Sequence, residues 1–320
     1  MIPVMQYQAP ALYFHPHIET IAPALLRKVK DFGYTHQERI PTPDDDFLDI
    51  DLVLRGNKRV VIISHGLEGN SKRAYVTGMA RAFDRAGYDV MAWNYRGCSE
   101  EMNKQLRFYH SGATDDLSLI IDHALGKAYE YIHLVGFSLG GNLTLKYLGE
   151  MGKQAIGKIA SAVAFSVPLN LHTSCIQISR PSNFMYALRF LNDLKEKIRN
   201  KAQLMPNQLD TSPLNGIKTL QDFDDHYTAP LHGFINAIHY YESCSSINFV
   251  QDIGIPTLIV NAMNDPFLSE DCYPMDMLRD HPVVHFQSPK RGGHVGFTEF
   301  NKDGLFWSEK RAVRFVAGHG

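Results

Sequence analysis

The sequence predicts an α/β fold, a mostly parallel sheet with helices on both faces, on three observations. Apolar runs rich in Val and Ile recur along the chain, and amphipathic segments of helical length separate them. The runs are continuously hydrophobic, which is typical of strands covered on both sides. Of the 320 residues, 44% are hydrophobic and 21% are charged, a composition that can bury a sizeable core.

Six of these runs are expected to be strands of the sheet. They cover residues 60–64, 89–93, 131–136, 159–167, 256–261 and 283–287. Helices are expected near residues 71–86, 114–125, 140–150, 270–279 and 306–315. Residues 39–54 are expected to form an antiparallel hairpin, and residues 1–30 an irregular arm that contains prolines.

The regular alternation stops between residues 169 and 250. This segment has no convincing strand, but residues 186–202 and 230–244 show helical spacing. It follows the fourth of the six strands and precedes the fifth. We therefore expect a helical lid at 169–250, inserted between two parts of one core at 1–168 and 251–320.

Charge and hydropathy narrow the class of ligand. The chain has 32 basic and 34 acidic residues, so it carries no strong field to gather nucleic acid or anionic lipid. Its longest strongly apolar run, residues 159–169, is shorter than the roughly 20 residues of a membrane span. No secretory signal is recognised, and we expect a cytoplasmic protein with a small-molecule substrate and no stable membrane anchor. No pattern specifies an oligomeric state.

Ser138 is the candidate nucleophile. Residues 136–140, Gly-Phe-Ser-Leu-Gly, form a G-x-S-x-G pattern between an apolar strand and a predicted helix. A strand that turns abruptly into a helix strains its central residue, and the two glycines let neighbouring elements approach closely. Ser138 is thereby presented at the edge of the sheet, at a helix start that favours developing negative charge.

A serine hydroxyl needs a base, and the base needs an acid to orient it. Asp265 directly follows the strand 256–261, and Pro266 breaks the chain there. His294 lies after the last strand, in a loop where Gly292 and Gly293 permit an unusual backbone path. Chain order and placement therefore favour Asp265 as the acid and His294 as the base.

The oxyanion of an acyl-transfer reaction needs backbone donors. The strand 60–64 runs into His65-Gly66-Leu67, where folds of this kind supply one amide. We expect the donors to be the amides of Leu67 and of Leu139, which follows the nucleophile.

Other polar residues are less decisive. Arg96 could brace loops at the rim of the site and Cys98 could face the pocket, although a structural turn is favoured there. Ser111 is expected to cap a helix. We expect no metal site, because the spacing of the five potential ligands matches no metal motif. These residues are His15, His17, His110, Asp115 and Asp116.

Several of these motifs resemble the YheT-like subfamily of α/β-hydrolases. The resemblance runs from FHPHIETIAP near the start through HGLEGNS, NYRGCS, YHSGATDD, GFSLGGN, FDDHYTAPLHGF, NDPF and GGHVGF. It implies the α/β-hydrolase fold, a triad of Ser138, Asp265 and His294, and hydrolysis of carboxylic esters. Eukaryotic members of the group resemble medium-chain acyl esterases, alcohol acyltransferases or phospholipases. They carry an amino-terminal hydrophobic anchor that is not recognised here, which makes membrane phospholipid a less expected substrate.

Together these observations predict a cofactor-independent serine hydrolase that cleaves short- to medium-chain carboxylic esters through an acyl-enzyme. One alternative passes the acyl group to an alcohol instead of water. The other is a ligand-binding member of the fold without turnover, which the presence of every catalytic part disfavours.

Overall fold

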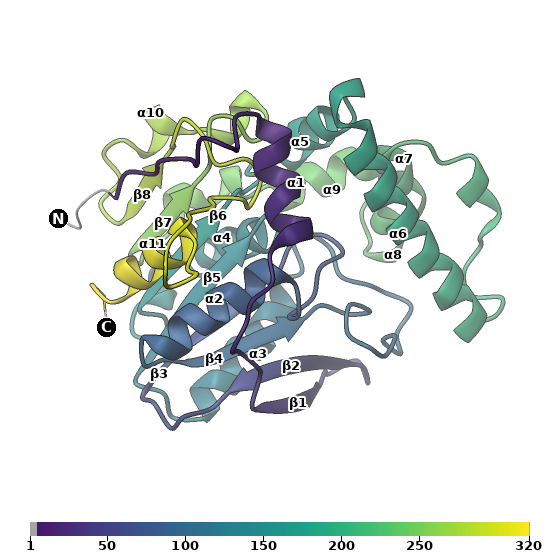
Figure 1. Ribbon diagram of the computed structural model, residues 1–320. Coiled ribbons are helices and arrows are strands. Elements are labelled where there is room, and N and C mark those ends of the chain that lie inside the picture. Colours follow the sequence, from purple (N-terminus) through teal and green to yellow (C-terminus); the bar gives the residue numbers. More distant parts are fainter. Residues whose placement is uncertain (1–4, 320) are drawn as a thin grey trace.

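The computed structural model describes residues 5–319 and contains one eight-stranded sheet (Figure 1). The strands lie in the order β1-β2-β4-β3-β5-β6-β7-β8. The hairpin β1–β2 is antiparallel, β2 pairs antiparallel with β4, and the remaining pairs are parallel. The strands are β1 (His36–Pro41), β2 (Phe47–Val53), β3 (Arg59–Ser64), β4 (Asp89–Asn94), β5 (Tyr131–Phe137), β6 (Ser161–Phe165), β7 (Thr257–Val260) and β8 (Val284–Gln287). All six predicted parallel strands and the predicted hairpin are present.

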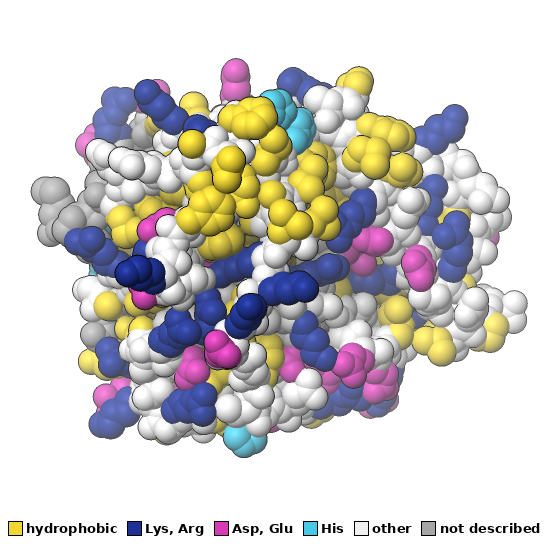
Figure 2. All heavy atoms as spheres, in the orientation of Figure 1, with side chains coloured by type: hydrophobic (Ala, Val, Ile, Leu, Met, Phe, Trp, Pro, Cys, Tyr) yellow, Lys and Arg dark blue, Asp and Glu magenta, His cyan; other side chains and the backbone are white. Residues whose placement is uncertain are grey.

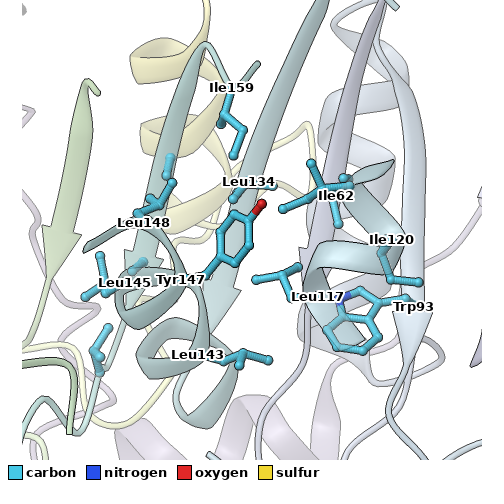
Figure 3. Packing of buried hydrophobic residues seen from close by; sticks show 14 of the residues in the cluster. Ile62, Trp93, Leu117, Ile120, Leu134, Leu143, Leu145, Tyr147, Leu148 and Ile159 are labelled. Atoms are coloured by element: carbon cyan, nitrogen blue, oxygen red, sulfur yellow. The ribbon is translucent and has the colours of Figure 1, made fainter. Parts of the chain in front are cut away.

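Helices cover both faces of the sheet, as the apolar runs predict. One face packs against α3 (Thr114–Gly126) and α4 (Leu139–Met151), and Figure 3 shows Trp93, Leu134 and Tyr147 among the buried residues of this layer. The other face packs against α2 (Ala74–Arg85) and α11 (Trp307–Val316). The helix expected at 270–279 is shorter, a 3-10 turn (Glu270–Cys272) followed by α10 (Met275–Leu278), because Pro274 interrupts it.

The segment between β6 and β7 contains helices and, among its described residues, no strand. Its long helix α6 covers Phe184–Leu204, and a separate apolar cluster holds the segment together. The helix expected at 230–244 is wrong as one element. It divides at Gly233, which has a φ of +78°, and Asn236 caps the second piece. The other helices here are α5 (Leu171–Ile178), α7 (Leu220–Phe223), a π-helical turn (Asp224–Thr228), α8 (Ala229–Leu231) and α9 (Ala237–Cys244).

The prediction that residues 1–30 are irregular is wrong, because they contain helix α1 (Pro16–Leu26). A proline in the first turn suits a helix, since the missing N–H would have no partner there, and His15 caps it. Glu19, Thr20 and Pro23 are buried against the rest of the protein. Tertiary contact thus stabilises a helix that the prolines seemed to exclude.

The outward face of α1 is apolar. Figure 2 shows apolar side chains gathered over this helix on the visible face, and exposed members include Ile21, Leu25 and Leu26. Among residues 5–319, no helix is long and apolar enough to cross a membrane.

Arg96 is buried in a network of carboxylates and does not line the cavity at Ser138. Its guanidinium lies 2.8 Å from Asp116 and 2.9 Å from both Asp44 and Asp46. It therefore joins the β1–β2 turn to α3, and only 2% of its side chain is exposed. Asp116, considered in the sequence analysis only as a metal ligand, is one of its buried partners.

Candidate active site

Ser138 occupies the sharp turn between β5 and α4. Its backbone has φ +53° and ψ −119°, a strained conformation for a residue with a side chain. A Cβ on Gly136 would collide with the carbonyl of Gly140, and one on Gly140 would collide with the carbonyl of His65. The two glycines are therefore required by the close approach of β5, α4 and the loop after β3.

The structure brings Ser138, His294 and Asp265 together at the carboxyl ends of the strands. His294 Nε2 lies 2.9 Å from Ser138 Oγ. His294 Nδ1 lies 2.8 Å and 3.1 Å from the two carboxylate oxygens of Asp265. The carboxylate also accepts the N–H of Phe267 at 2.9 Å, and its side chain is fully buried. With Nδ1 donating to Asp265, Nε2 is left as the acceptor for the serine proton.

Helix α1 holds the loop that carries His294. Thr20 Oγ1 accepts the N–H of His294 at 3.0 Å, and its own hydroxyl donates to the Pro16 carbonyl. The Glu19 carboxylate accepts the N–H of Gly292 at 3.0 Å and the side-chain amide of Asn264 at 2.6 Å. Sequence reasoning missed both residues. Both residues lie in the HPHIET segment, which supports the family resemblance but to which the sequence analysis assigns no role.

Leu67 and Leu139 both line the cavity beside Ser138. The Gly66 amide is already used, because it donates to Tyr75 Oη at 2.9 Å. Within residues 5–319, neither the Leu67 nor the Leu139 amide has a hydrogen-bond acceptor. Both amides are therefore available as donors, and their role as the oxyanion donors stays a prediction.

Three comparisons place the chain among known proteins. A family model described as "Serine aminopeptidase, S33" matches residues 55–273. The Escherichia coli protein named "Putative esterase YheT" is 32% identical over 290 residues, which are 88% of this chain and 84% of that protein. The chain belongs to the YheT-like group of α/β-hydrolases.

This α/β-hydrolase also matches more distant proteins. Mouse "Phospholipase ABHD3" is 28% identical over 242 residues, 75% of this chain and 58% of that protein. The Pyrococcus furiosus esterase Pf2001 has the same fold, with a TM-score of 0.59, 15% identity and 99% of each chain covered.

A cavity of about 140 Å³ opens beside Ser138 in this α/β-hydrolase. Its walls come from the loop after β3, the loop before α3, the turn between β5 and α4, and the segment between β6 and β7. Tyr241 of the segment 169–250 lines it, whereas four other aromatic residues of this segment do not: Phe184, Tyr186, Phe190 and Phe234. Two of those four, Tyr186 and Phe190, pack instead on Phe267, whose ring lies 4.3 Å from the His294 ring.

Lys197 of α6 connects the segment 169–250 to the Leu67 loop. Its ammonium lies 2.7 Å from the Glu68 carboxylate and 3.2 Å from Cys98 Sγ. The Glu68 N–H in turn donates to Tyr109 Oη at 2.9 Å. Cys98 itself does not line the cavity, and burial raises the pKa of its thiol to about 11.

The structure also bears on the expected cap at Ser111 and on the residues considered for a metal. Ser111 does not cap α3, because the N-cap is Ala113 without a side-chain bond; Ser111 lines the cavity and accepts from Tyr240 Oη. The five residues considered as metal ligands do not form a common site, and in the part of the chain from 5 to 319 no group of three or more His, Cys, Asp or Glu side chains is placed so that it could hold a metal ion.

Proposed function

We propose that this α/β-hydrolase is a serine esterase that cleaves carboxylic esters through an acyl-enzyme. The observation that carries the proposal is the 2.9 Å contact between His294 Nε2 and the hydroxyl of a strained Ser138. The names of two relatives, putative esterase and phospholipase, denote enzymes that cleave esters.

The reaction follows from this geometry. His294 removes the proton of Ser138 as Oγ attacks the ester carbonyl, and Asp265 stabilises the resulting imidazolium and keeps its orientation. The amides of Leu67 and Leu139 receive the oxyanion, and losing one such donor typically costs about 10²- to 10³-fold in rate. His294 then gives its proton to the leaving alcohol, and water releases the acyl group by the same steps.

The cavity volume bounds the substrate. A cavity of about 150 Å³ lined by aliphatic side chains accommodates benzene, so about 140 Å³ suits a group of roughly six heavy atoms. Each methylene buried contributes about 0.8 kcal/mol at best. We therefore infer that kcat/KM rises with acyl length up to about six carbons, within the short- to medium-chain range.

We also propose that residues 169–250 act as a helical lid. The cavity beside Ser138 has Leu171, Ile198 and Tyr241 in its wall, and all three come from this segment. Lys197 ties the segment to the loop that carries the Leu67 amide. The lid would thereby shape the pocket and steady one oxyanion donor.

The test is a series of p-nitrophenyl esters from acetate to decanoate, with Ser138→Ala as the control. The proposal expects hydrolysis that peaks near hexanoate and is lost in Ser138→Ala. Cleavage of p-nitroanilides in preference to the esters would indicate a peptidase, and full activity of a folded Ser138→Ala variant would remove the proposal.

A further inference from the structure

Two sequence motifs without a role in the proposed triad meet in the cavity at Ser138. Residues 109–112, Tyr-His-Ser-Gly, precede α3, and residues 223–234 lie in the segment between β6 and β7. Their side chains form much of the cavity wall, including His110, Asp224 and His232. An apolar acyl chain alone would not need these polar groups.

Most polar atoms of this wall are already paired. The Asp224 carboxylate accepts the hydroxyls of Thr228 and Tyr241. Both ring nitrogens of His232 face backbone carbonyls, of Thr228 at 2.7 Å and Phe108 at 3.1 Å. These groups are committed to the protein.

His110 differs from its neighbours. Its Nδ1 accepts the N–H of Gly112 at 3.2 Å, so the neutral ring carries its proton on Nε2. Burial lowers the pKa of His110 well below its usual value, and the nearby His232 adds to this, so the ring is neutral at pH 7. Within residues 5–319, Nε2 has no hydrogen-bond partner. It is not one of the fully buried unpaired polar atoms, so it keeps some accessible surface.

Three rings surround His110 in the cavity wall. Its centroid lies 4.6 Å from His232, 5.5 Å from Phe234 and 5.8 Å from Tyr240. An N–H donor held in this way, in a mostly apolar cavity, favours a ligand that brings an acceptor.

We propose that His110 Nε2–H binds an oxygen acceptor on the part of the ester that occupies the cavity, so that the preferred substrates carry an oxo, hydroxy or ether oxygen in that chain. The proposal rests on the esterase activity proposed above. In a cavity for roughly six heavy atoms, the acceptor would lie within a few atoms of the ester carbonyl.

The experiment compares 4-nitrophenyl hexanoate with the 4-oxo- and 5-oxohexanoate esters. Each kcat/KM is divided by the rate constant of that ester with hydroxide, which removes differences in intrinsic reactivity. For the wild type, at least one oxo ester should exceed hexanoate by about threefold to tenfold, as expected for one added hydrogen bond. A ratio near one for both oxo esters would overturn the proposal.

Variants assign the preference to the nitrogen. His110→Phe keeps a ring in the aromatic cluster and should bring the ratio close to one, whereas His110→Gln keeps an N–H donor and should retain part of it. His232→Phe is the matched control from the same wall, since both ring nitrogens of His232 face backbone carbonyls of the protein, and it should keep the ratio. An unchanged ratio in His110→Phe, or an equal loss in His232→Phe, would overturn the assignment.

The possible negative results have different meanings. If His110→Phe does not fold, the wild-type ratio and His110→Gln decide the question. If hexanoate is hydrolysed and the ratio is one, this inference alone fails. If no ester is hydrolysed, the proposed function fails and this inference with it.

Discussion

The hydroxyl oxygen of Thr20 accepts a hydrogen bond from the backbone N–H of His294 at 3.0 Å, although 274 positions separate the two residues in the chain. Glu19, the preceding residue, binds the N–H of Gly292 in the same loop. A Cβ on Gly293 would collide with Glu19, so α1 and the loop fit closely. An amino-terminal helix thus positions the base of the proposed triad.

Replacement of Thr20 by Val should therefore lower kcat roughly tenfold and leave KM nearly unchanged, because the loop loses one anchor while the cavity stays intact. Steady-state kinetics on a p-nitrophenyl ester measure this. Thr20→Ser keeps the hydroxyl and should restore most of kcat. A Thr20→Val variant with wild-type kcat would contradict the positioning role.

Replacement of Asp265 by Asn should leave the fold intact and lower kcat on the order of 10⁴-fold, since the amide favours the wrong tautomer of His294. Circular dichroism checks the fold, and ester hydrolysis checks the activity. Near wild-type turnover would show that Asp265 is not the acid.

The predictable part of the structure is the part encoded locally. Continuous apolar runs predict all the parallel strands, and chain order predicts which Asp and His approach Ser138. These features depend on periodicity and on the ends of strands. The break of the expected helix 230–244 is local as well: Gly233 ends one helix with a positive φ and Asn236 caps the next, signals that helical spacing alone does not register.

The unpredicted part depends on contacts between distant segments. Helix α1 forms around two prolines because Glu19 and Thr20 find partners in the loop before α11. Arg96 lies between three carboxylates that no spacing in the sequence connects. The wall of the cavity also combines distant segments. Helical spacing therefore could not show that Tyr241 lines the cavity and Phe234 does not.

Replacement of Arg96 by Met should lower the free energy of unfolding by about 3–5 kcal/mol, because Asp46 and Asp116 remain as unpaired buried carboxylates. Urea denaturation followed by tryptophan fluorescence measures it. Arg39→Met is the control: the Arg39 side chain is 45% exposed and pairs with half-buried Asp49 and exposed Glu101, so its loss should cost less than about 1 kcal/mol. Equal effects of the two substitutions would contradict the buried network.

Stability should also depend on the protonation of Asp224. Burial raises the pKa of this carboxyl to about 6, above the ordinary value near 3.9, so the folded state holds the proton more tightly. The contribution of Asp224 to the free energy of unfolding is therefore present at low pH and is lost as pH rises from about 4 to 6.

The difference between wild type and Asp224→Asn isolates this contribution, because buried neutral histidines such as His65 act with the opposite sign. Urea unfolding at several pH values should show the wild type losing about 1–3 kcal/mol relative to the variant across that window. A wild type that gains stability relative to Asp224→Asn as the pH rises would contradict the raised pKa.

Labelling with a fluorophosphonate, followed by peptide mapping in a mass spectrometer, tests whether Ser138 is the nucleophile. One adduct is expected, on Ser138, with no adduct in Ser138→Ala and a strongly reduced rate of labelling in His294→Ala. An adduct on another serine, or labelling undiminished in Ser138→Ala, would contradict that assignment.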